Sequence, residues 1–61
     1  MFRPGDGVVA RRTLDPRKLN QSGPIVPQGL FGKVTSAYSG RVTVRFDNGA
    51  HLSNLTENDV E

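Results

Sequence analysis

Polar and apolar side chains alternate most regularly in the segment 41–46, Arg-Val-Thr-Val-Arg-Phe. A period of two is typical of a strand buried on one face, so the two valines and the phenylalanine are predicted to point into a core. Arg41, Thr43 and Arg45 then share the opposite face. Turn signals stand on both sides, at 38–40 and 47–49. The pattern therefore predicts a meander of three antiparallel strands.

The apolar pattern also predicts the register of the second hairpin. A loop made only of residues 48–49 would place His51 opposite Phe46, on the core face. When Asp47 joins the loop, the register shifts by one residue and apolar side chains face one another. We therefore expect a type I turn closed by Gly49 in the left-handed conformation, with a G1-type bulge. The predicted pairs are Phe46 with Ala50, Val44 with Leu52 and, on the outer face, Arg45 with His51.

The first half of the chain predicts one strand and one long loop. Residues 8–12 alternate as a strand, with Val8 and Ala10 inward. Residues 13–28 show no periodicity and hold three of the four prolines. A loop of this length is uncommon in a small domain and often functional, whereas the simpler interpretation is a mobile insertion. Ile25 and Val26 are expected to pin the end of the loop onto the core.

The remaining segments complete an all-β prediction. A strand is expected over 33–37, with a bulge near 35–36 because Ala37 suits the core better than Ser36. Residues 56–59 are rich in capping side chains and predict one turn of 3₁₀ helix, after which Val60 begins a last short strand. The predicted fold is a single domain, residues 1–61: a small five-stranded barrel with a long loop after the first strand and a 3₁₀ turn near the C-terminus.

Composition excludes several classes of protein. The chain has 61 residues and no cysteine, so disulfides and thiolate metal sites are excluded. With one histidine and no ligand cluster, we expect no metal and no cofactor. No apolar run approaches the roughly 20 residues of a membrane span, and the N-terminus lacks the apolar region of a signal peptide. We expect a soluble, cytoplasmic protein.

The charges are segregated along the chain, although the net charge is only +2. Residues 1–45 carry all eight Lys and Arg with two Asp, a balance of +6, and residues 46–61 carry four acids and no base, a balance of −4. Such asymmetry is typical of a basic face directed at an acidic partner. The alternative is that the acidic tail folds back over the basic strand and neutralises it.

The order of predicted elements resembles that of SH3-like small barrels over nearly the whole chain. Gly5-Asp6-x-Val8 looks like the opening motif of many bacterial members. Gly32-x-Val34, followed by Val-Thr-Val at 42–44, is similar to the KOW-type motif of ribosomal and transcription-elongation proteins. The same residues, with Ser36 and the Arg-Phe-Asp at 45–47, resemble the small SH3-like subunit of photosystem I, whose closing Asp-Glu-Val is matched only in part by Asp59-Val60.

These resemblances imply binding rather than a particular activity. The KOW-like motif implies contact with nucleic acid or a ribonucleoprotein complex, and the photosystem-like pattern implies protein docking. Recognition of PxxP peptides is disfavoured, because the chain has one Tyr and no Trp to build an aromatic groove.

Two clusters of basic residues are candidate binding surfaces. The outer face of the meander is predicted to present hydroxyl side chains among cations, which suits phosphate contacts, although a solvated strand face has the same composition. No aromatic residue is expected on that face for base stacking, and Tyr38 is the aromatic expected to be exposed at a turn. A cationic loop can also wrap a partner, or serve solubility alone. The first candidate surface is Lys33, Arg41, Arg45 and His51, with Tyr38 nearby; the second is Arg11, Arg12, Arg17 and Lys18.

Catalysis is not expected. No side chain near His51 in sequence is placed to activate it. The opening Gly-Asp-x-Val is similar to that of the plasmid-borne type II dihydrofolate reductases, which are SH3-like barrels. Their cofactor-binding Val-Gln-Ile-Tyr is absent, however, since residues 50–53 read Ala-His-Leu-Ser. The sequence thus favours a non-catalytic module that binds nucleic acid or a ribonucleoprotein, with a docking subunit of a larger complex as the alternative; the oligomeric state stays open.

Overall fold

The central hairpin of the sheet has the register that the apolar pattern predicts. Val44 pairs with Leu52 and Arg45 pairs with His51. The loop closes through Gly49, whose N–H donates to the Phe46 carbonyl at 3.0 Å and whose φ is +90°. A left-handed φ favours glycine because it has no Cβ. The three-residue loop is therefore confirmed.

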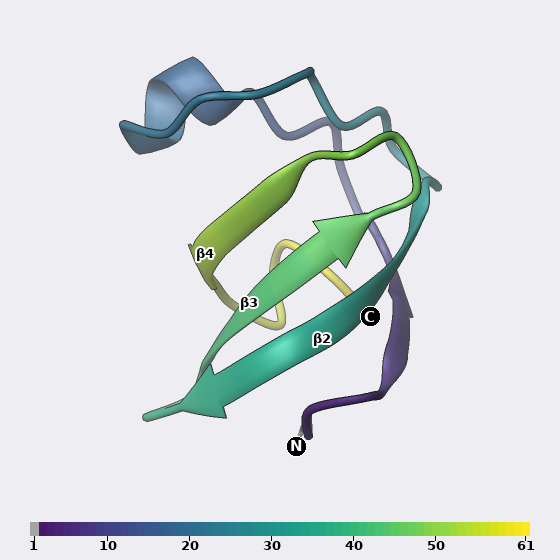
Figure 1. Cartoon of the computed structure of the whole chain (residues 1–61), viewed down its shortest axis with the longest axis vertical. Coiled ribbons are helices and arrows are strands. Elements are labelled where there is room, and N and C mark those ends of the chain that lie inside the picture. The colour runs from purple at the N-terminus through teal and green to yellow at the C-terminus, as the bar shows by residue number, and fades with distance from the viewer. Residues whose placement is uncertain (1) are drawn as a thin grey trace.

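The hairpin belongs to a four-stranded antiparallel sheet, which we describe from a computed structural model covering residues 2–61 (Figure 1). The strands follow one another in the sheet in chain order, so each is hydrogen-bonded to its neighbour in sequence. One short 3₁₀ helix lies in the long loop after the first strand. The elements are β1 (Gly7–Val9), η1 (Pro16–Leu19), β2 (Phe31–Tyr38), β3 (Arg41–Phe46) and β4 (His51–Leu55).

The predicted bulge in the second strand is also confirmed. The register of β2 against β3 shifts between Val34 and Ser36. An extra residue at this point lets the next apolar side chain return to the buried face. As a result, Ala37 stands opposite the buried Val42 and is itself half-buried.

The long loop is attached to the core by two of its own residues. Leu14 and Val26 form an isolated backbone bridge, and both side chains are buried. The Asp15 carboxylate accepts the Arg17 N–H at 3.0 Å and so caps η1. The prediction that residues 25–26 pin the loop is confirmed for Val26, whereas Ile25 is 57% exposed.

Two features of the predicted barrel are wrong. Among residues 2–61 the 3₁₀ turn lies at Pro16–Leu19, and residues 57–59 form an ordinary turn in which the Thr56 carbonyl accepts both Asp59 N and Val60 N. The predicted fifth strand is reduced to an isolated bridge between Val60 and Ala10.

The sheet is also open, rather than closed as a barrel requires. The free edge of β4 meets the side chain of Gln21 instead of another strand. Gln21 Nε2 donates to the Ser53 carbonyl at 3.0 Å, and its Oε1 accepts the Ser53 N–H at 2.8 Å. A single side-chain amide therefore takes the place that a neighbouring peptide group would fill in a closed barrel.

The core lies on the inner face of the sheet, between the strands, the long loop and the C-terminal segment. Val8 and Ala10 are buried as predicted, and so are the apolar residues of the central hairpin. The long loop adds Val26, as predicted, and Leu14, which no local pattern indicated. The buried set is Val8, Ala10, Leu14, Val26, Val34, Val42, Val44, Phe46, Ala50, Leu52, Leu55 and Val60. No helix among residues 2–61 is long and apolar enough to cross a membrane.

Phe46→Ala is expected to destabilise the domain by about 3–5 kcal/mol, because the lost side chain lies in the core and leaves a cavity. Phe31→Ala is the matched control, since the same atoms are removed from a side chain that is 46% exposed. Urea denaturation measures both. Equal losses of stability would contradict the inward placement of Phe46.

Gly32→Ala is expected to destabilise by about 1–3 kcal/mol through overpacking. A Cβ at this buried position would lie 2.7 Å from Val44 Cγ1 and 2.8 Å from Phe46 Cδ1. A Cβ at Gly49 would contact no other atom within 4 Å. Gly49→Ala should therefore lower the stability only through the strain of its positive φ, by about 1 kcal/mol. Thermal unfolding of the two variants compares their losses of stability. A smaller loss for Gly32→Ala than for Gly49→Ala would show that the inner face of β2 is loosely packed.

Candidate nucleic-acid interface

Three basic side chains form a row across the outer face of the sheet, which we call the basic row: Lys33 on β2, Arg45 on β3 and His51 on β4. Lys33 pairs with Arg45, and Arg45 pairs with His51. All three are exposed. Side chains directly opposite one another on neighbouring strands have Cβ atoms about 4.5–5.5 Å apart, and like charges placed so are destabilising. The two cations of the row, Lys33 and Arg45, therefore repel each other slightly and concentrate positive potential at one place.

Within residues 2–61, no carboxylate forms an ion pair with the basic row. The ion pair that the described residues form lies elsewhere, between Arg12 and Asp59. Asp47 lies near the row, because its N–H donates to the Phe31 carbonyl, two residue pairs beyond the Lys33–Arg45 pair. A diagonal neighbour of this kind lies about 7–8 Å from Lys33, within reach of a long side chain, but the two side chains form no ion pair here.

Hydroxyl groups extend the polar surface beside the basic row. Thr35 Oγ1 donates to the Thr43 carbonyl at 3.3 Å and lies 3.3 Å from His51 Nε2. A shallow hollow lies over the same area, lined in part by Lys33, Thr35, Arg45 and the acidic Asp47. Cations and hydroxyls around a shallow depression suit the oxygens of a phosphate group.

The outer face carries an aromatic residue that sequence reasoning missed. Phe31 precedes Lys33 by two residues on β2 and is exposed, so both side chains stand on the same face. The prediction of a face without aromatics is therefore wrong. The error came from starting the strand at Lys33, whereas β2 begins at Phe31. Residues 33 and 35 alternate on the outer face. Extending that alternation back to residue 31 would have predicted that Phe31 faces outward.

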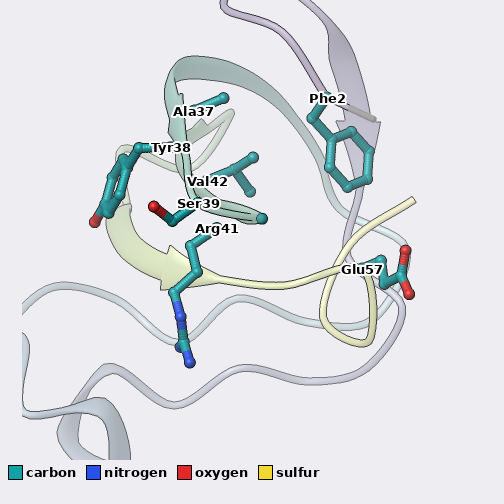
Figure 2. Close-up of a pocket in the computed structure, with 8 residues that line it drawn as sticks. Phe2, Ala37, Tyr38, Ser39, Arg41, Val42 and Glu57 are labelled. Atoms are coloured by element: carbon teal, nitrogen blue, oxygen red, sulfur yellow. The ribbon is translucent and has the colours of Figure 1, made fainter.

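The predicted exposure of Tyr38 is confirmed, at 49%. Tyr38 pairs with Arg41 at the far end of β2, and both side chains are exposed. The Tyr38 hydroxyl donates to Asn54 Oδ1 at 3.1 Å, so the ring reaches from β2 to β4. Figure 2 shows Tyr38 turned away from the apolar side chains of Ala37 and Val42.

The second predicted cluster is divided by the structure. Arg11 Nη1 donates to the Glu57 carbonyl at 2.8 Å, and Arg12 donates from Nε and Nη2 to Asp59 Oδ1 at 3.0 and 2.5 Å. Arg17 and Lys18 instead lie on η1, exposed. The cluster is thus two separate pairs, one of them engaged by the C-terminal turn.

The acidic tail folds back, but against β1 rather than over the basic row. Val9 N donates to the Glu61 carbonyl at 2.9 Å, and Glu61 N returns a bond to the Val9 carbonyl at 3.0 Å. The carboxylate of Asp59, a residue only 6% exposed, faces Arg12. Of the two interpretations of the charge asymmetry, neutralisation by the C-terminal acids therefore applies to Arg12 and not to the basic row.

A second hollow, of about 660 Å³, lies at the end of the sheet beside the β2–β3 turn (Figure 2). Its size is in the usual range for ligand pockets. Ala37 and Val42 point toward the side of the hollow on which Phe2 lies, whereas Arg41 and Glu57 point away. This second hollow, unlike the basic row, is thus mainly apolar.

The comparisons with known proteins add no assignment to this geometry. No family model, no curated protein and no solved structure matches the chain. Within residues 2–61, no group of three or more His, Asp or Glu side chains is placed to hold a metal ion.

Asp59→Ala is expected to destabilise the domain by about 1–3 kcal/mol, because a nearly buried carboxylate loses its bonds from Arg12 and from Thr56 N. The exposed carboxylate of Glu57 supplies the control variant, Glu57→Ala, which should change stability by no more than about 0.5 kcal/mol. Chemical denaturation compares them. Similar values for both would mean that Asp59 does not hold the C-terminal turn.

Proposed function

We propose that the protein is a non-catalytic module that binds nucleic acid through the outer face of its sheet. The observation that carries the proposal is the basic row, in which Lys33, Arg45 and His51 stand in register on three adjacent strands. A cation beside a like charge gains more from a bound phosphate than an isolated cation does, because the phosphate relieves repulsion as well as adding attraction.

Contacts between cations and phosphates position a nucleic-acid backbone but do not distinguish one base from another. Thr43 stands between Arg41 and Arg45 on β3, where its hydroxyl offers a further hydrogen bond to a phosphate oxygen; the Thr35 hydroxyl proton is already given to the Thr43 carbonyl. Affinity should therefore depend strongly on salt and weakly on sequence. Non-specific binding of this type has a Kd of about 10⁻⁴–10⁻⁶ M at physiological salt.

The SH3-like resemblance supports the same proposal. The order of one short strand, a long loop and a three-stranded meander agrees with that family's plan, although the sheet here is open. We propose a distant, open member of the SH3-like group that acts in the cytoplasm, where nucleic acid and ribonucleoprotein partners are present.

Protein docking is the second candidate, and the apolar hollow at the end of the sheet favours it. Phe2, Ala37 and Val42 would accept an apolar side chain of a partner. Such docking rests on apolar contact, so its affinity would respond weakly to salt, in contrast to phosphate binding.

Lys33→Ala/Arg45→Ala is expected to weaken binding to DNA and RNA of any sequence. The log–log salt slope should fall by about two units, one for each lost phosphate contact. Both side chains point away from the core, so the fold should be unchanged. Fluorescence anisotropy with labelled DNA and RNA at several salt concentrations measures the affinity and the slope.

Arg17→Ala/Lys18→Ala is the matched control, because it removes the same two charges from η1. An equal loss in both double variants would show that net charge, rather than the basic row, drives binding. Absence of wild-type binding near 50 mM salt would end the nucleic-acid proposal and leave docking.

A further inference from the structure

We propose that the ligand of the outer face is single-stranded nucleic acid, with Phe31 and Tyr38 as the surfaces on which its bases stack. This inference rests on the proposed function and names the class of its substrate. The two residues stand at opposite ends of β2 and are 46% and 49% exposed. Every base has an aromatic face, so stacking on such rings tolerates any sequence.

The Phe31 ring is held in place by packing on a glycine. A Cβ built on Gly7 would lie only 2.9 Å from Phe31 Cε1 and Cζ, so the ring covers the backbone of β1 at that point. Covering an edge-strand glycine with an aromatic ring is a known device for stabilising sheets. The ring is thus fixed over the sheet, yet nearly half of the residue's surface is open to solvent.

The Tyr38 ring is held by a hydrogen bond instead. Its hydroxyl donates to Asn54 Oδ1, and Asn54 lies where the register of β3 against β4 shifts, with φ of 60°. The ring thereby reaches across the end of β3. Because both rings are already fixed, a stacked base would immobilise little additional side-chain freedom, which favours binding.

Each ring has a cation beside it. Lys33 follows Phe31 by two residues on the same face, and Arg41 stands directly opposite Tyr38. Arg45 stands directly opposite Lys33 on β3 and adds a second cation at that end. A base stacked on either ring would therefore bring its phosphate close to a positive charge, which is the combination that single-strand sites use.

The spacing of the rings favours an unpaired strand over a duplex. Phe31 and Tyr38 are seven positions apart on β2, at most about 23 Å at the usual rise of a strand, so one bound strand would cross the basic row on its way between them. In a duplex the bases are paired and stacked on one another, and only phosphates and groove edges are offered to a flat sheet. Exposed aromatic side chains would then have no partner.

The test compares single strands with the matching duplex, both of about twelve nucleotides, by fluorescence anisotropy. The wild type should bind the single strands of DNA and RNA more tightly than the duplex. Phe31→Leu and Tyr38→Leu keep apolar bulk but remove the rings. Each should lower single-strand affinity about tenfold and leave both duplex affinity and the salt slope unchanged, because no cation is lost.

Ring-retaining variants supply the controls. Phe31→Trp should restore single-strand affinity, and Tyr38→Phe should retain most of it while losing the bond to Asn54. Circular dichroism and thermal unfolding show that each variant is folded. Wild-type affinity in Phe31→Leu/Tyr38→Leu, or tighter binding of the duplex, would overturn this inference while leaving phosphate binding by the basic row in place. Absence of binding to either form would overturn the proposed function itself.

Discussion

The register of the β3–β4 hairpin is the constraint on which the rest of the structure depends. A shift of one residue in this pairing would turn every side chain of β4 to the other face of the sheet. The loop closed by Gly49 fixes the register that buries Leu52 beneath β3. The same register places His51 beside Arg45 on the outside. The core and the candidate interface are therefore two consequences of one turn.

Much of the sheet could be predicted because its strand pairing is determined by residues close together in the sequence. Alternation over 41–46, together with the competition between two loop lengths, was enough to give the pairs of the central hairpin. The position of Ala37, one residue out of step with Val34, was likewise enough to predict the bulge of β2. In both cases the inner face of the sheet must be apolar, and only one strand register meets that requirement.

The remaining features depend on contacts between residues far apart in the chain. Nothing near Gln21 indicates that its amide will pair with Ser53, and nothing near Leu14 indicates Val26 as its partner. Closure of a barrel was wrongly predicted for this reason. The basic row followed from alternation alone, but its aromatic neighbour Phe31 was missed because the start of a strand is poorly marked between two glycines.

The pairing of Gln21 with Ser53 has a consequence for behaviour at high concentration. An uncovered edge strand is a template on which a second chain can continue the sheet, and this is a common route to aggregation. Here both backbone groups of Ser53 are occupied by a side chain from the long loop. Another molecule that approached β4 would first have to dislodge that loop, which is anchored in the core through Leu14 and Val26. The loop therefore helps to keep neighbouring molecules apart.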